Sequence, residues 1–225
     1  MVRFKGAHFA KDIILTCVRG YVAYPLSDRQ IEELMEERGV AVDHATVNRW
    51  VVKYSPLLEA AFHARKRPVG RRWRMDETYI KVRGHWRYWY RAVDKSGQTI
   101  DFLLTEHRDT DAARRFLTQA IRRHGVPETI TIDGSEAHAA AIRGYNEVHG
   151  TAIVIRQVKY LNTIIEQDHR VIKRVTRPML GFTSLDAARC TLAGIELMPM
   201  WRKGPMEKGI EQSLTPAVQF YGLAA

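Results

Sequence analysis

Hydrophobic and polar residues follow two different periods along the chain. In residues 1–62, apolar positions recur every three or four residues, which is the period of an amphipathic helix. From Trp73 onward, short runs of aromatic and β-branched residues are separated by turn residues, which predicts strands. The sequence therefore predicts a small all-α segment followed by a larger α/β segment.

The all-α segment contains three predicted helices. The first covers residues 11–22, and the second covers residues 28–38 with Ser27 as its N-cap. Gly39 ends the second helix, and Asp43 caps the third. Helix, glycine-containing turn and helix is the helix-turn-helix pattern, in which the later helix enters the major groove of DNA. A plain helical bundle with a solvated polar face has the same pattern, so both interpretations remain.

If the segment is a helix-turn-helix domain, its third helix supplies the DNA contacts. Asn48, Arg49 and Lys53 lie on that helix. Arg bonds guanine edges, Asn bonds adenine edges, and Lys bonds a phosphate. A basic linker over residues 63–72 follows, and Arg71 and Arg72 at its end are further candidates for phosphate contact. A solvated spacer explains the linker equally well.

The remaining pattern predicts a ribonuclease-H-like catalytic domain over residues 73–205, with residues 206–225 as a C-terminal tail. Three strands form an antiparallel meander, and two later strands alternate with helices, which gives a mixed sheet with helices on both faces. Arg114, Arg115, Arg122 and Arg123 are expected on the outward side of the first of these helices. The predicted strands cover residues 73–82, 85–93, 99–105, 129–132 and 152–158, and the helices begin at residues 109–110, 135, 162 and 184.

Three acids in this region are the candidate catalytic and metal-binding residues: Asp76, Asp133 and Glu166. Asp76 lies in the first strand, Asp133 closes the fourth, and Glu166 lies in a helix. Carboxylates suit Mg²⁺ or Mn²⁺, and a pair of such ions can clamp the attacking and leaving oxygens of a phosphoryl displacement. Because strand side chains alternate faces, Asp76 and Glu77 cannot both serve, and Asp76 is preferred. Capping of the next helix is the alternative role of Asp133.

The helix that carries Glu166 has a polar stripe beside its apolar arc. Glu166, His169, Lys173 and Arg177 share this stripe. Glu166 can reach a metal ion while Lys173 and Arg177 contact DNA phosphates, and His169 either bonds a phosphate or orients the nucleophile. A solvated face with ion pairs between successive turns is the alternative. Asp168 falls inside the apolar arc, so burial there requires a partner such as an arginine.

Composition and charge restrict the partners. The chain has 225 residues, 45% of them hydrophobic, with a net charge of +10 and a pI near 9.8. A basic surface favours a polyanion such as DNA. The absence of a long apolar run or a signal peptide makes a membrane partner unexpected, and a cytoplasmic protein is expected. Cys17 and Cys190 fit no zinc or disulfide pattern, and no Walker loop indicates ATP.

Several stretches resemble the bacterial insertion-sequence transposases of the IS-six group. The motifs are WRMDETYIKV at 73–82, YWYRAVD at 88–94, RQVKY at 156–160 and IEQDHR at 165–170, with FKG, YPLS, VDH and RW near the amino terminus. The resemblance covers nearly the whole chain. It implies an Asp-Asp-Glu transposase with Asp76, Asp133 and Glu166 as its triad, two Mg²⁺ ions per active site, and Lys173 as a neighbouring basic residue. The group commonly has Lys where this chain has Gly134 and a second Asn where it has Thr163.

The resemblance also implies the reaction and the partners. The expected enzyme binds the terminal inverted repeats of its element, cuts their 3′ ends and joins them to target DNA, with replicative transposition through a cointegrate. It has to bring two ends together, so a dimer or larger homo-oligomer is expected. A metal-dependent nuclease on the same scaffold and a non-catalytic DNA-binding regulator are the two alternatives.

Overall fold

The structure is a computed structural model that describes residues 2–4, 7–66, 68–158, 163–202 and 215–223. Contacts divide the chain into two compact units. Unit 1 contains Met1–Arg67 together with Ile172–Ala225, and unit 2 contains Pro68–Val171. The predicted domains, with a catalytic domain over residues 73–205 and a tail over residues 206–225, differ from these compact units and stay a prediction. The part from Ile172 onward instead contacts the N-terminal helices, and parts of the predicted linker and tail lie outside the described residues.

Unit 1 is helical. Its first three helices begin where the sequence predicts. The second and third are capped as expected, because Ser27 and Asp43 accept hydrogen bonds from the backbone N–H groups of Gln30 and Thr46. Gly39 follows the second helix with φ of +71°, a conformation that favours glycine. The described elements of this unit are α1 (Lys11–Ala23), α2 (Asp28–Glu36), α3 (His44–His63), the short η1 (Arg177–Met179), α7 (Leu185–Arg202) and α8 (Pro216–Gly222).

Helix α7 packs directly on α3 and α1. At Gly194 a Cβ atom would lie only 2.6 Å from the Ser55 Oγ on α3 and 2.7 Å from a methyl group of Val22 on α1. The missing side chain therefore lets the three helices approach closely. Leu192 and Ile195, on either side of this glycine, are fully buried. This contact explains why α7 belongs to unit 1 although it follows the sheet in sequence.

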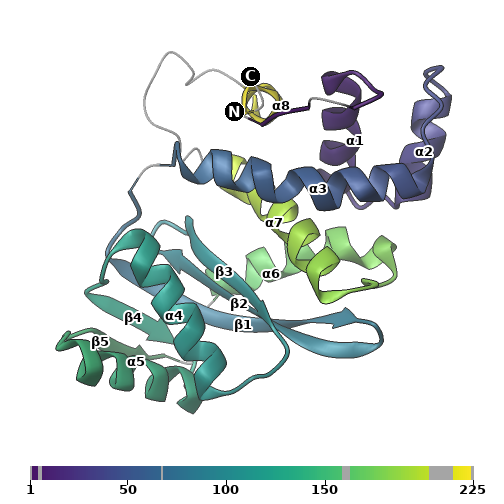
Figure 1. The fold of residues 1–225 in the computed structure, drawn as a ribbon. Coiled ribbons are helices and arrows are strands. Elements are labelled where there is room, and N and C mark those ends of the chain that lie inside the picture. The colour runs from purple at the N-terminus through teal and green to yellow at the C-terminus, as the bar shows by residue number, and fades with distance from the viewer. Residues whose placement is uncertain (1, 5–6, 67, 159–162, 203–214, 224–225) are drawn as a thin grey trace. The chain divides into compact units, whose positions relative to one another are not determined.

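Unit 2 is built on one five-stranded mixed sheet, as predicted (Figure 1). The strand order is β3-β2-β1-β4-β5, in which β1 pairs antiparallel with β2 and parallel with β4. This order, an antiparallel meander extended by parallel strands, is ribonuclease-H-like. The strands are β1 (Arg72–Val82), β2 (His85–Asp94), β3 (Thr99–Thr105), β4 (Thr129–Ile132) and β5 (Val154–Gln157).

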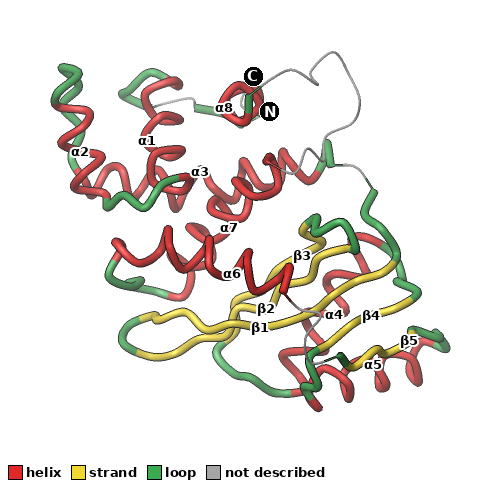
Figure 2. The backbone as a smooth tube through the Cα atoms, turned by 180° about the vertical axis from the view of Figure 1, so that it is seen from behind, coloured by secondary structure: helices red, strands yellow, loops and turns green. Residues whose placement is uncertain are grey.

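Helices α4 (Thr110–His124) and α5 (Glu136–His149) cover one face of the sheet, as the two opposite views show (Figures 1 and 2). Trp73 and Met75 point from β1 into the apolar core under these helices. Asp109 caps α4 by accepting a hydrogen bond from the Ala112 N–H. Helix α6 (Thr163–Thr176) contacts the opposite face through the side chains described below. No helix in the described ranges is long and apolar enough to cross a membrane.

Candidate active site

Asp76 and Asp133 come from neighbouring parallel strands. In the β1–β4 ladder, Arg72 pairs with Thr129 and Arg74 pairs with Thr131. Asp76 follows Arg74 by two residues, and Asp133 follows Thr131 by two residues. Extended by two residues, this register brings the backbone of Asp76 level with that of Asp133, although β4 ends at Ile132 and Asp133 lies in the turn that follows. Asp76 is 9% exposed, whereas Asp133 lies exposed in the turn after β4.

Asp133 is not the cap of α5. The N-cap of that helix is Ser135, and its side chain makes no cap hydrogen bond. Asp133 instead accepts a hydrogen bond from the Ser135 N–H at 3.3 Å, which fixes the turn. Gly134 between them has φ of +101°, a conformation that only glycine adopts readily. Glycine, where the IS-six group commonly has Lys, therefore suits the backbone of this turn. The change removes none of the three candidate acids.

Glu166 lies on α6, whose bounds confirm the predicted helix. The side chains of Glu166 and Thr163, and all of Asn162, lie outside the described parts of the structure. Among the side chains that are described, no group of three His, Cys, Asp or Glu residues could hold a metal ion. The position of the Glu166 carboxylate relative to the two strand acids is therefore outside the described geometry, and its place in the site stays a prediction.

Two side chains next to Glu166 attach α6 to the sheet face that carries Asp76. Asp168 is buried, and its Oδ2 accepts from Nη1 of the fully buried Arg91 at 2.5 Å. Arg91 also donates to the Thr99 Oγ1 at 2.5 Å, and it stands directly across from Asp76 in the β1–β2 register. The arginine partner that burial of Asp168 required is therefore Arg91. His169 is buried as well, with Nδ1 at 3.9 Å from Oδ2 of Asp76.

Glu77 points to the opposite face, as strand alternation predicts. Its carboxylate forms an ion pair with Arg108, and its Oε2 lies 3.1 Å from Nε2 of His138 on α5. Neither of these two atoms has hydrogen-bond geometry with a partner, so the contact is a close approach of a neutral imidazole. Burial lowers the pKa of His138 to about 4 and, against the opposing charge of Arg108, raises the pKa of Glu77. The nearby negative charge of Asp133 opposes the lowering of the His138 pKa and adds to the raising of the Glu77 pKa.

This cluster of Glu77, Arg108 and His138 was not predicted. Strand alternation was enough to turn Glu77 away from Asp76, but the partners come from distant segments. Arg108 precedes α4, and His138 lies on α5. The charge of Asp133 acts on both Glu77 and His138, so this cluster lies near the turn after β4.

The candidate DNA contacts of unit 1 lie on α3. Asn48 is half-buried and is hydrogen-bonded to the side chain of Tyr21, whereas Arg49 and Lys53 are exposed. Arg49 donates to the Thr46 Oγ1 at 2.5 Å, and the Lys53 ammonium lies 5.1 Å from the centre of the Tyr54 ring. Asn48 and Arg49 also line a surface hollow of about 760 Å³ within this unit.

The other candidate DNA contacts lie outside α3. Arg71 and Arg72 are exposed at the start of β1, and Arg71 lies 3.6 Å from Glu128. Lys173 and Arg177 are exposed on α6 and η1. His169 differs from all of these because it is buried beside Asp76. Its Nδ1 lies 3.9 Å from Oδ2 of Asp76, and its burial leaves little of its surface exposed.

Residues 70–205 match the model of a family described as a DDE domain. The match covers more than half of the chain and contains all three candidate acids. The chain belongs to the DDE transposases of insertion sequences. The resemblance to the IS-six group is thereby confirmed.

The relatives are similar over most of their length. The chain is 40% identical over 201 residues to the transposase for insertion sequence-like element IS431mec of Staphylococcus aureus N315, covering 86% of this chain and 85% of that protein. It is also 40% identical, over the same shares, to the Staphylococcus aureus transposase for insertion sequence element IS257 in transposon Tn4003.

Solved structures with a similar fold include two integrase catalytic cores. The BIV integrase core has a TM-score of 0.46 at 18% identity, covering 68% of this chain and 95% of that one. The HTLV-2 integrase core in complex with magnesium, in its dimeric form, has a TM-score of 0.43 at 19% identity, covering 60% and 87%.

Proposed function

We propose that this transposase cuts the 3′ ends of its insertion sequence and joins them to target DNA, with Asp76, Asp133 and Glu166 as the metal-binding catalytic acids. The observation that supports the proposal is the parallel register of β1 and β4, because Asp76 and Asp133 each follow the last paired residues, Arg74 and Thr131, by two positions. The Arg91–Asp168 and His169–Asp76 contacts attach the helix that carries Glu166 to that same face.

The donor set fits a pair of hard divalent cations. Carboxylate oxygens favour Mg²⁺ or Mn²⁺, and His138 is directed to the other face. Asp76, Asp133 and Glu166 would hold the two ions. When bound, such ions lower the pKa of the attacking hydroxyl and neutralise charge on the phosphate that is transferred. Two chemical steps follow: water hydrolyses the phosphodiester at the element end, and the released 3′-OH then attacks a target phosphodiester.

The remaining residues position the DNA and the acids. The buried Arg91–Asp168 pair fixes α6, and His169 orients Asp76. Exposed Lys173 and Arg177, with Arg71 and Arg72, are proposed to bind phosphates. We also propose that α2 and α3 form a helix-turn-helix module whose Asn48, Arg49 and Lys53 contact the terminal inverted repeats.

Assembly and outcome complete the proposal. Both element ends must be held together, so the active form is a dimer or larger homo-oligomer. The relatives are transposases of insertion sequences, which supports action on bacterial DNA in the cytoplasm. Replicative transposition through a cointegrate is the expected result.

The test uses the full chain, a supercoiled plasmid and labelled pre-cut end duplexes taken from the DNA that flanks the gene. With Mg²⁺ we expect plasmid-joined ends, and a chelator should abolish them. Asp133→Asn should lose joining but still bind the ends, whereas Asp111→Asn, which removes an exposed acid on α4, should behave as the parent. Cutting without joining would instead identify a nuclease, and end binding without any metal-dependent cutting would identify a regulator.

A further inference from the structure

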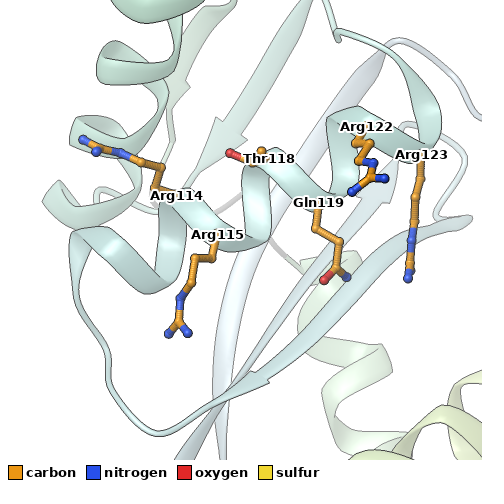
Figure 3. Close-up of a pocket in the computed structure, with 6 residues that line it drawn as sticks. All are labelled: Arg114, Arg115, Thr118, Gln119, Arg122 and Arg123. Atoms are coloured by element: carbon orange, nitrogen blue, oxygen red, sulfur yellow. The ribbon is translucent and has the colours of Figure 1, made fainter.

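We propose that the outward side of α4 is a second DNA-binding surface, which holds the sugar–phosphate backbone of duplex DNA without reading its sequence. This inference rests on the proposed function only in that the protein handles DNA. The surface surrounds a hollow of about 730 Å³ and is called the α4 arginine face (Figure 3). Its lining residues are Arg114, Arg115, Thr118, Gln119, Arg122 and Arg123.

The positive charge of this face is largely unneutralised. Arg114, Arg115 and Arg122 are exposed, and none of them forms an ion pair within the described part of the chain. Asp111 stands four residues before Arg115, at the spacing of a helical ion pair, yet the two are not paired within the described structure. A solvated helix face ordinarily mixes both signs of charge. Three free guanidinium groups on two helical turns instead suit a polyanion.

Neighbouring residues hold the face in shape. Asp101 on β3 accepts from Arg123 at 2.8 Å and from the Gln119 amide at 3.1 Å, so one buried carboxylate positions two side chains of the face. On the other side, a Cβ atom at Gly144 of α5 would come within 3.3 Å of the Arg114 guanidinium. The glycine therefore leaves room for that guanidinium. The face is partly preorganised, which lowers the entropic cost of binding.

The spacing of the arginines matches a DNA strand. An α-helix rises about 1.5 Å per residue, so Arg115 and Arg122 are about 10 Å apart along the axis. Each strand of a duplex presents about one phosphate per 3.4 Å of its axis, so this length faces about three phosphates. The planar guanidinium binds a phosphate through two parallel hydrogen bonds. Three unpaired arginines are thus enough for one short stretch of backbone.

The chemistry of the lining selects a duplex backbone over other anions. The six residues include no aromatic side chain on which a base could stack, which argues against a nucleotide or single-stranded DNA. The face also lies on the side of the sheet opposite to Asp76, since α4 covers the Trp73 and Met75 side. The duplex held there is therefore not the segment whose phosphodiester reacts. It is either a further part of the element end or the target DNA.

The test measures binding of the full chain to a random-sequence duplex by fluorescence anisotropy between 50 and 200 mM salt. Over this range, a protein that makes six phosphate contacts loses about 10³-fold in affinity. For Arg115→Gln/Arg122→Gln we expect the slope of log affinity against log salt to fall by about 1.8, or about 0.9 per phosphate contact, with affinity reduced at least about 10-fold at low salt. Lys81→Gln/Lys95→Gln removes the same charge from exposed positions elsewhere in unit 2 and should change the slope little.

Two further measurements complete the experiment. Arg115→Lys/Arg122→Lys keeps the charge and should keep most of the slope. Repeating the series with a terminal-repeat duplex identifies the source of the DNA: loss only with the random duplex indicates target DNA, and loss with both indicates the element end. An unchanged slope in the glutamine variant, or an equal change in the lysine-to-glutamine control, would overturn the proposal. Because only binding is measured, failure of strand transfer would leave this result interpretable.

Discussion

The two faces of the five-stranded sheet use the same strands and have opposite chemistry. On the face covered by α4 and α5, Trp73, Met75 and Ile132 join a continuous apolar core. On the other face, Arg91, Asp168 and His169 are buried around Asp76. The apolar face supplies stability through the area it removes from water, whereas charges buried on the other face contribute little net stability. The polar face therefore adds little to the stability of the fold, and it is the face that carries Asp76.

The neighbours Asp76 and Glu77 show this difference at the scale of one residue. Asp76 faces Arg91 across the ladder and approaches His169, whereas Glu77 is paired with Arg108 at the edge of the apolar face. Both acids are inaccessible to most of the solvent, but they point to opposite faces of the sheet. Four experiments test this contrast.

The largest expected effect separates these two acids. Asp76→Asn should lower strand joining by about 10³-fold or more, because it removes a charged ligand from the site where the transition state is stabilised. Glu77→Gln should stay within about 10-fold of the parent enzyme, because its side chain faces away from Asp76, toward Arg108 and His138. Joining assays on purified, folded variants make the comparison. Equal losses in both variants would remove the distinction between the faces.

The next effect concerns the buried ion pair. Arg91→Met should lower the free energy of unfolding by about 3–5 kcal/mol, because it leaves Asp168 buried without its charge partner. The double variant Arg91→Met/Asp168→Leu should recover much of this loss, since two apolar groups replace the pair. Ile142→Val in the apolar core is the control, with an expected loss of about 1 kcal/mol. Urea denaturation measures all three, and a cost below that of the control would contradict a buried pair.

A smaller effect depends on pH. His138 has a pKa of about 4 in the folded protein, below its unfolded value, so the unfolded state binds more protons between about pH 6.5 and 4. Acidification through this window should therefore destabilise the protein, on the order of 3 kcal/mol from His138. Glu77 has the opposite sign: its raised pKa makes proton uptake stabilising as the pH falls, which offsets part of the loss.

Variants at the two positions separate these contributions. His138→Gln should flatten the fall in stability between pH 6.5 and 4, and Glu77→Gln should make it steeper. Unfolding measured by urea at a series of pH values checks both. A parent-like pH profile in His138→Gln would show that this imidazole titrates normally.

The smallest effect lies in the turn after Asp133. Gly134→Lys places a side chain at φ of +101° and should cost about 1–2 kcal/mol of stability, although nothing lies within 4 Å to obstruct the new Cβ. Ser135→Ala next to it should change stability by less than about 0.5 kcal/mol, because the Ser135 side chain makes no cap hydrogen bond. Thermal melting distinguishes the two. A neutral Gly134→Lys would show that this turn relaxes.

The sequence alone determined the local structure of this protein. The caps Ser27 and Asp43 and the alternation that separates Asp76 from Glu77 act over a few residues, so period and residue type predict them. The fold class followed from the order of these elements, because few arrangements of strands and crossover helices are allowed.

Tertiary structure decided the long-range pairings. Periodicity shows that Asp168 falls on an apolar arc, but only the fold brings Arg91 to it from a strand far away in sequence. In the sequence, Gly194 is an ordinary helical glycine. Only the packing of α7 on α3 and α1 shows why it is small and why α7 belongs to unit 1. The physical reason is that local conformation depends on neighbours in sequence, whereas burial, charge partners and packing depend on segments that meet only after folding.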